Sequence, residues 1–220
     1  MGCNRMKKAT KKEIVEIKKR FLERYGSAKT ELEFKSDYEL LVAIILSAQC
    51  TDKRVNIITK GLFAALPTVE AMADSSVEEI ASLIKSCSYF NNKAKNLLAM
   101  AQNVVANFGG SIPHDEASLK SLAGVGQKTA HVFMIEFLQS NHMAVDTHVF
   151  RTAHRLGLSS AKTAVKTEED LSKAYVSELA TLHQAMVLFG RYICKAKNPL
   201  CETECFLVEF CKSRSNFKPA

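Results

Sequence analysis

Apolar residues recur at helical spacing along nearly the whole chain, and no stretch alternates with period two for long enough to predict a strand. One stripe runs through Ile14, Ile17 and Phe21, and another occupies the range 94–108 until Gly109-Gly110 ends it. This pattern predicts an all-α protein of about ten helices. The later helices are expected at 116–122, 127–139, 147–155, 168–179 and 181–193.

The composition excludes several classes of protein. Of 220 residues, 47% are hydrophobic and 24% are charged, which suits a globular protein with a sizeable core and not a disordered or fibrous chain. The longest apolar run, Leu40–Leu46, is far shorter than the ~20 residues that cross a bilayer. The basic N-terminus is not followed by an apolar stretch, so it is not a secretory signal. We therefore expect a soluble cytoplasmic protein that does not contact a membrane.

Lysine and arginine outnumber aspartate and glutamate by 30 to 23, which gives a formal net charge of +7. A basic balance favours an anionic partner, although alone it is weak evidence. Much of the excess lies near the N-terminus, where a solvated helix face explains it equally well. These basic residues are Arg5, Lys7, Lys8, Lys11, Lys12, Lys18, Lys19, Arg20 and Arg24.

Four of the seven cysteines lie within one C-terminal segment spaced C-x6-C-x3-C-x5-C, namely Cys194, Cys201, Cys205 and Cys211. The odd total and the lack of a secretory signal argue against a disulfide framework, so a shared metal centre or four unrelated core cysteines remain. Structural zinc sites usually contain C-x2-C knuckles, which this segment lacks. Iron–sulfur clusters accept longer spacings, and the segment therefore favours a cluster. Cys3, Cys50 and Cys87 are scattered elsewhere.

The nonapeptide from Leu122 to Ala130, LAGVGQKTA, predicts a helix–hairpin–helix. Gly124 and Gly126 allow a tight turn, and Val125 between them can anchor it in the core. The free backbone N–H groups at the start of the following helix suit a DNA phosphate without reading any base. A nucleotide-binding P-loop is excluded, because Gln127 separates the glycine from the lysine and a helix is expected in place of the preceding strand.

Lys128 lies in the first turn of the helix that follows the hairpin, and two roles suit it there. As a point charge it can contact a phosphate. Alternatively, the helix N-terminus, nearby cations and partial desolvation disfavour the ammonium form, which would let the neutral amine attack a sugar carbon as a nucleophile. From this motif alone the two roles are equally well supported.

Asp146 begins the stretch Asp146-Thr147-His148 at the start of another predicted helix. The simplest interpretation is an N-cap, which would keep its carboxylate ionised. An ionised carboxylate facing Lys128 could also stabilise a cationic sugar. His148 suits a structural or DNA-backbone contact better than metal binding, because no partner ligand stands nearby. The carboxylate favours Lys128 as a nucleophile.

Together, these motifs resemble the endonuclease III family of helix–hairpin–helix DNA glycosylases. The resemblance extends from Glu31 to Cys211, and its motifs come in the family's order. They are Leu46–Asp52 (LSAQCTD), Asn91–Lys93, Leu122–Ala130, Val145–Arg151, Phe189–Cys194 and the cysteine segment. Any one of these matches could arise by chance, but all six in order are specific.

The resemblance implies an all-α fold of two lobes with a DNA-binding cleft between them. A six-helix barrel with the hairpin would occupy residues 30–140, and residues 1–29 and 141–220 would form a second lobe that holds a 4Fe–4S cluster. Family members remove oxidised pyrimidines from duplex DNA through a lysine Schiff base and nick the abasic site by β-elimination. The expected protein is thus a monomer that acts on damaged DNA in the bacterial nucleoid, with Lys128 and Asp146 on opposite walls of the cleft.

The resemblance also assigns roles in DNA binding. Gln49 matches a family residue that fills the hole left by a flipped nucleotide, whereas Tyr89 stands where the family has a leucine wedge. Lys195 and Lys197 match basic residues that face the DNA backbone. Two further departures are Ala123, where the family hairpin has proline, and the x3 spacing between Cys201 and Cys205, where the family has x2. A bulge could absorb that additional residue, and zinc or an empty site remains an alternative.

Three other functions compete with this interpretation. Adenine-specific members of the superfamily lack the lysine and carry an additional C-terminal domain, whereas Lys128 is present here and the sequence ends soon after Cys211. An alkylated-base glycosylase would use Asp146 with water and would not need Lys128. A non-catalytic DNA-binding protein would use the hairpin alone, and would gain nothing from a carboxylate beside its DNA.

Overall fold

The computed structural model describes residues 8–213, and every regular element in this range is helical, as the sequence predicted. Cys3, Arg5 and Lys7 lie outside the described residues. The α-helices are α1 (Lys11–Tyr25), α2 (Asp37–Ser47), α3 (Asp52–Ala65), α4 (Val69–Ala73), α5 (Val77–Ile84), α6 (Phe90–Phe108), α7 (Glu116–Lys120), α8 (Gln127–Leu138), α9 (Thr147–Arg155), α10 (Ala164–Ala174) and α11 (Leu179–Leu188). A π-helix, η1 (Phe189–Ile193), and a 3-10 turn, η2 (Val208–Phe210), follow α11.

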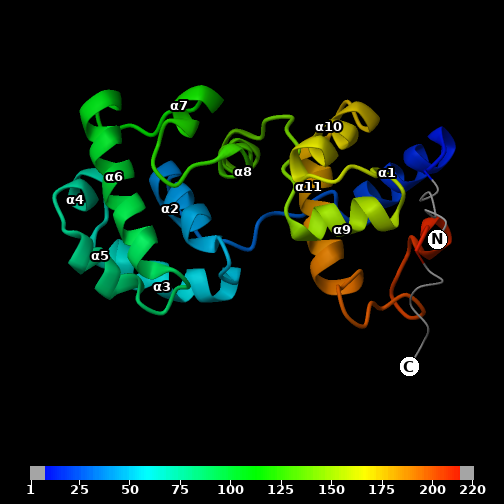
Figure 1. Cartoon of the computed structure of the whole chain (residues 1–220), viewed down its shortest axis with the longest axis horizontal. Helices are drawn as coiled ribbons and strands as arrows, with labels where there is room; N and C mark the ends of the chain where they lie inside the picture. The colour runs from blue at the N-terminus through cyan, green and yellow to red at the C-terminus, as the bar shows by residue number, and fades with distance from the viewer. Residues whose placement is uncertain (1–7, 214–220) are drawn as a thin grey trace. The chain divides into compact units, whose positions relative to one another are not determined.

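The chain divides into two compact units, each with its own apolar core. One unit spans Thr30–Gln139 and contains α2 to α8 (Figure 1). The described residues up to Lys29 and from Ser140 form the other unit, with α1, α9, α10, α11, η1 and η2.

In the unit Thr30–Gln139, α2 supplies the centre of the core. Every side chain from Tyr38 to Leu46 that is apolar is buried, because this helix is hydrophobic on all its faces. The longest helix, α6, packs against α4 and α5, which lie beside it in Figure 1. The helix α8 packs against both α2 and α7, and this contact places the hairpin between α7 and α8 at the rim of the core.

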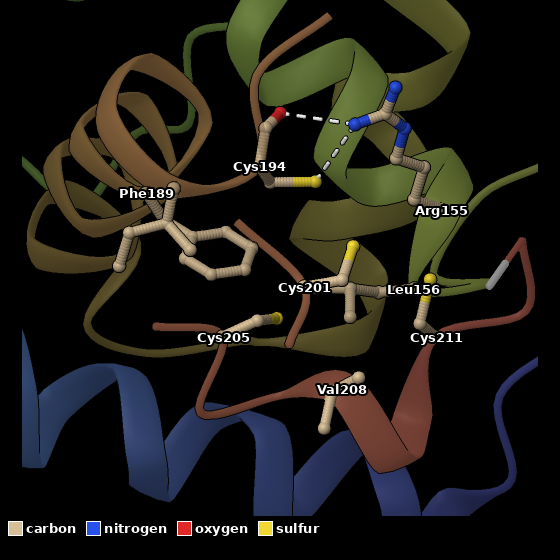
Figure 2. A pocket seen from close by; sticks show the side chains of 9 residues that line it. Arg155, Leu156, Phe189, Cys194, Cys201, Cys205, Val208 and Cys211 are labelled. Atoms are coloured by element: carbon tan, nitrogen blue, oxygen red, sulfur yellow. Dashed lines mark hydrogen bonds between the residues drawn. The ribbon is translucent and has the colours of Figure 1, made fainter. Parts of the chain in front are cut away.

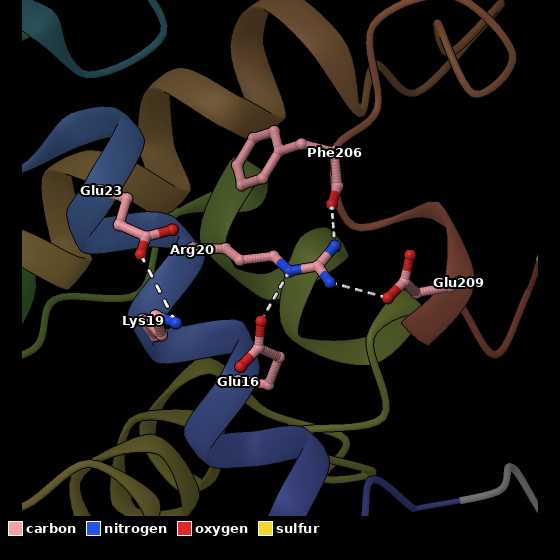
Figure 3. Close-up of polar contacts among 6 residues, drawn as sticks. All are labelled: Glu16, Lys19, Arg20, Glu23, Phe206 and Glu209. Carbon is pink, nitrogen blue, oxygen red and sulfur yellow. Dashed lines mark hydrogen bonds and ion pairs between the residues drawn. The ribbon is translucent and has the colours of Figure 1, made fainter.

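The second unit joins the two ends of the chain. The helix α1 packs against α11, and the ring of Phe21 makes edge contacts with the rings of Phe189 and Phe206. Figure 3 shows how the Arg20 guanidinium extends this contact: it donates to the Glu16 carboxylate at 2.9 Å, the Phe206 oxygen at 2.9 Å and the Glu209 carboxylate at 2.8 Å. Arg20 therefore serves the fold, and the basic N-terminal helix is not merely a solvated face.

Two helix boundaries differ from those expected from sequence. The helix expected at 168–179 spans Ala164–Ala174, because the Thr163 side chain caps it by accepting from the Lys166 N–H. It ends well before Glu178, whose positive φ of 64° starts α11. The helix expected at 181–193 is α-helical only to Leu188, and the remainder is the π-turn η1.

Within the described residues, no helix combines the length and the apolar character needed to cross a membrane.

Candidate functional site

The hairpin between α7 and α8 forms the tight turn that its glycines predict. The N–H of Val125 donates to the oxygen of Leu122 at 3.1 Å, and the Val125 side chain is buried in the core. Gly124 has a φ of +80°, a conformation that L-residues rarely adopt. Ala123, where the resemblance led us to expect proline, does not prevent this turn.

Gly124 is required for a second reason, which is a close approach to α6. A Cβ atom at this position would lie 3.2 Å from the Cβ of Asn96. The hairpin therefore rests on the side of α6, and a larger residue at 124 would have to displace that contact.

The first turn of α8 leaves its backbone N–H groups without a side-chain cap. Gly126 is the N-cap, with extended backbone angles, and it offers no side chain to accept from these donors. Lys128 is exposed, and within the described part of the chain no hydrogen bond or ion pair holds its amine. The partial desolvation expected from sequence is therefore not seen, because Lys128 is exposed in the first turn of α8. The arrangement offers an anion site with a lysine beside it.

Asp146 caps α9, as the sequence predicted. Its Oδ1 accepts from the backbone N–H groups of both His148 and Val149 at 2.8 Å. Its Oδ2 accepts no hydrogen bond from the described residues, and the residue is only partly buried. One oxygen therefore orients the carboxylate while the other remains available to a cationic group.

His148 is oriented by the arginine one turn later. The Nη2 of Arg151 lies 3.1 Å from the Nδ1 of His148, and it also donates to the oxygen of Gly190 at 2.7 Å. Because a guanidinium only donates, Nδ1 is the acceptor and the ring proton of neutral His148 lies on Nε2. Gly190 permits this packing, since a Cβ there would lie only 2.8 Å from the Cβ of His148. The neighbouring Thr147 is exposed at the first position of α9.

The four C-terminal cysteines lie around one pocket, which we name the cysteine pocket. Figure 2 shows their sulfur atoms turned toward a common centre, and none of the four is in a disulfide. Among the residues that the structure describes, the lining includes no histidine or carboxylate, so these residues offer soft thiol sulfurs as the donor set. The pocket is lined by Arg155, Leu156, Phe189, Ile193, Cys194, Cys201, Cys205, Val208 and Cys211.

The thiols of the cysteine pocket lie close enough together to affect one another's pKa. Burial raises the pKa of the Cys205 thiol to about 11; the backbone N–H of Leu207 opposes this, and the thiols of Cys194, Cys201 and Cys211 raise it further. Burial likewise raises the pKa of Cys211. A metal centre would reverse this effect, because coordination deprotonates a thiol. Four converging thiols in an apolar pocket fit a 4Fe–4S cluster or a single thiolate-bound metal ion.

The segment between Cys201 and Cys205 forms a widened turn. The oxygen of Leu200 accepts from the N–H groups of both Glu204 and Cys205, each at 3.1 Å. The second bond spans five residues, as in a π-bulge, and brings Cys205 back to the pocket. With this turn, Cys205 lines the cysteine pocket together with Cys201.

Arg155 organises the loop between Cys194 and Cys201, a role that the sequence analysis did not assign. Its Nη1 lies 3.3 Å from the Cys194 sulfur and 2.7 Å from the oxygen of Lys195, and Nη2 reaches the oxygen of Ala196 at 3.3 Å. This fixes the backbone that carries Lys195, which is partly buried, and Lys197, which is exposed. The available signal was the four-residue spacing from Arg151 to Arg155 on one helix face.

Gln49 and Tyr89 share an unusual backbone conformation. Both are exposed, and they have positive φ values of 55° and 57°. This left-handed region is uncommon for residues other than glycine, and for a bulky residue it marks strain or a functional constraint. Tyr89 is 65% exposed, which is unusual for a large aromatic side chain that no neighbour covers.

The predicted site residues are divided between the two units. Lys128, the hairpin, Gln49 and Tyr89 belong to Thr30–Gln139. The other unit holds Asp146, Thr147, His148, the cysteine pocket, Lys195 and Lys197.

Comparison with known proteins identifies close relatives. Residues 42–176 match the family of HhH-GPD superfamily base excision DNA repair proteins. Endonuclease III of Rickettsia conorii is 44% identical over 191 residues, which cover 86% of this chain and 90% of that protein. Endonuclease III of Escherichia coli K12 is 36% identical over 90% of this chain and 94% of its own length. A solved structure of a trapped endonuclease III–DNA covalent intermediate has a TM-score of 0.90 and 34% identity, and the match covers 94% of this chain and 98% of that one.

Proposed function

This chain belongs to the endonuclease III family of base excision DNA repair proteins, and from that premise we propose that it removes oxidised pyrimidines from duplex DNA with Lys128 as its nucleophile. It is a DNA glycosylase and AP lyase. The observation that carries the residue assignment is the exposed Lys128 in the uncapped first turn of α8, beside a backbone anion site. The related complex trapped as a covalent endonuclease III–DNA intermediate supports an enzyme nucleophile.

The chemistry begins when the neutral amine of Lys128 attacks C1′ of the damaged nucleotide. The Nζ–C1′ bond forms, the glycosidic C1′–N bond breaks, and Nζ loses a proton while the base leaves with its electron pair and takes up a proton. Opening of the C1′–O4′ bond gives an iminium between Nζ and C1′, and O4′ takes a proton. Loss of a proton from C2′ then expels the 3′ phosphate by β-elimination, and water releases Lys128 from the imine.

The carboxylate of Asp146 would stabilise the positive charge that develops on this sugar. Its capped Oδ1 fixes the orientation, and the open Oδ2 can face the cationic group. Such a charge acts more strongly where bound DNA excludes water.

The remaining site residues would hold and open the duplex. The hairpin amides, the Nε2–H of His148, the hydroxyl of Thr147 and the amines of Lys195 and Lys197 are suited to phosphates, which position DNA without reading its sequence. The exposed side chains of Gln49 and Tyr89 would fill the space left by the flipped nucleotide. We expect a monomer that acts in the cytoplasm.

The endonuclease III family carries a metal cofactor, and for this chain we assign it as a 4Fe–4S cluster held by Cys194, Cys201, Cys205 and Cys211. When bound, the cluster would cross-link the segment that carries Lys195 and Lys197. We expect this structural role because the lyase reaction itself needs no electron transfer. Purified protein should contain about four irons per chain and absorb broadly in the visible range. Cys201→Ser should lose iron whereas Cys50→Ser, which lies outside the cysteine pocket, should retain it; iron-free protein with one zinc per chain would contradict the assignment.

Borohydride trapping tests the nucleophile. Wild-type protein on duplex DNA with thymine glycol or an abasic site should give a covalent adduct, and Lys128→Gln should give none while still binding abasic DNA. Lys120→Gln, which removes an exposed lysine from α7 just before the hairpin, should still form the adduct. Base loss without an adduct in any variant would indicate a water-using monofunctional glycosylase.

A further inference from the structure

Lys93 is a buried lysine near the start of α6 that the proposed chemistry does not use. It is only 6% exposed, and its Nζ donates to the oxygen of Leu46 at 2.8 Å, the oxygen of Ala48 at 2.6 Å and the sulfur of Cys87 at 3.2 Å. The three donors of an ammonium group thus meet three acceptors. A charge placed so deeply in a core is costly unless it is fully bonded, as it is here.

The first two acceptors are the carbonyls at the end of α2. A helix leaves its last carbonyls without intrahelical partners, and a cation at its C-terminus interacts favourably with the helix dipole. The next residue after Ala48 is Gln49, whose backbone is left-handed. Lys93 therefore fixes the chain immediately before one of the two proposed wedge residues.

The same lysine also fixes the other proposed wedge. Its Nζ bonds the sulfur of Cys87, two residues before Tyr89, while its backbone N–H donates to the oxygen of Tyr89 at 3.1 Å. The Cys87 thiol in turn donates to the oxygen of Leu46 at 3.4 Å. One residue thus joins the two loops that end in left-handed Gln49 and Tyr89.

Left-handed Gln and Tyr residues persist only where the surrounding structure determines the backbone. Without the bonds from Nζ, the end of α2 and the loop before α6 would lose the one side chain in the described residues that bonds to Leu46, Ala48 and Cys87 together. Two side chains that must enter the same gap in a DNA duplex would then lose their fixed separation.

We infer that Lys93 is a positioning residue for duplex opening, which holds Gln49 and Tyr89 in register so that both can replace a flipped nucleotide. This inference rests on the proposed function. Lys93 itself does not touch the reacting atoms. Its loss should therefore slow reactions that require a duplex to be opened, and leave the chemistry of Lys128 unaffected where no duplex exists.

Lys93→Met, which keeps the length of the side chain and removes its donors, tests this inference. In single-turnover assays, base release from duplex thymine glycol DNA should slow about tenfold. Borohydride trapping on a single-stranded abasic oligonucleotide should stay within about twofold of wild type. Lys95→Met removes an exposed lysine from the same helix. It should change neither the rate of base release from the duplex nor the trapping on the single strand. Equal losses on both substrates, or no loss on the duplex, would overturn the inference.

Two further measurements separate positioning from a general defect in folding. With 2-aminopurine opposite the lesion, the rise in fluorescence on binding should be smaller for Lys93→Met than for wild type. In a Gln49→Ala/Tyr89→Ala background, Lys93→Met should add little to the duplex defect, because it acts through those side chains. A full additional tenfold loss in that background would contradict the inference.

If Lys93→Met does not fold, Cys87→Ala replaces it. This variant cuts the bond to the Tyr89 loop but leaves both carbonyl bonds, so we expect a loss of about threefold on duplex DNA alone. An unchanged ratio of duplex to single-strand activity in Cys87→Ala would then overturn the inference. Failure of the wild type to form an adduct on duplex abasic DNA would instead refute the proposed function.

Discussion

The N-termini of α8 and α9 differ in how their free backbone N–H groups are capped. Both helices begin with backbone N–H groups that lack intrahelical partners. At α9, Asp146 satisfies two of them with its own carboxylate, whereas at α8 the N-cap is Gly126, which offers no side chain. The N–H groups that Asp146 caps at α9 are not available to another anion. The uncapped N–H groups at the start of α8 can accommodate a phosphate.

This difference shows that the N-cap residue determines what a helix start can bind. A carboxylate at the N-cap stabilises the helix by about 1 kcal/mol relative to alanine. Glycine at the N-cap costs only a few tenths of a kcal/mol relative to the carboxylate, and it leaves the amides available. At α8 the amides thus stay uncapped at a small cost in local stability, whereas at α9 the cap fixes the position of a charge.

Substitution of Asp146 should have the largest effect and should separate its two roles. Asparagine caps a helix as well as aspartate does, so Asp146→Asn should slow single-turnover base release about a hundredfold with little change in thermal midpoint. Asp146→Ala should show the same slow reaction and also lower the midpoint by about 3 °C. A normal rate of base release in Asp146→Asn would leave this residue as a cap only.

Gly126→Asp would convert α8 into the arrangement of α9. A Cβ at 126 meets no atom within 4 Å, and the backbone there is extended, so the side chain can be accommodated. The new carboxylate should occupy the amides and repel phosphate, which weakens binding to abasic DNA about tenfold while slightly raising the thermal midpoint. Gly126→Ser, a neutral cap, is the control and should weaken binding less. Unchanged affinity in both variants would show that the amides do not contact DNA.

Gly124→Ala should produce the smallest effect on DNA binding. It distorts the hairpin that leads into α8 but does not occupy the backbone amides of that helix. Alanine at a φ of +80° is strained by about 1–2 kcal/mol, and its Cβ would press against Asn96. We expect a lower thermal midpoint and DNA binding weakened about threefold, measured by fluorescence anisotropy. Gly126→Ala has neither strain nor a close contact and loses only the N-cap preference for glycine, so it should lower the midpoint less than Gly124→Ala does.

The sequence predicts features that depend on local patterns. The hairpin and the Asp146 cap were predictable because the residues that form them are neighbours in sequence. The boundary of α10 was missed because Thr163, which caps it, lies several residues before the expected start. Capping by a single hydroxyl outweighs the apolar pattern that suggested a later start.

The roles of Arg155 and Lys93 could not have been predicted in the same way. Their partners are mainly backbone carbonyls, at Lys195 and Ala196 for the arginine and at Leu46 and Ala48 for the lysine. Every residue has a carbonyl, so no residue type at the receiving position marks such a bond. Only the fold shows which carbonyls lack a helical partner and lie within reach of a cation.

The pairing of α1 with the C-terminal segment has a consequence for synthesis on the ribosome. Residues Thr30–Gln139 can complete their own core as soon as they emerge, because that unit is continuous in sequence. The helix α1 is made before this unit, yet its partners Phe189 and Phe206 are made after it. The apolar face of α1 therefore stays without its aromatic partners until the unit Thr30–Gln139 has been made, and the cysteine pocket can form only after that.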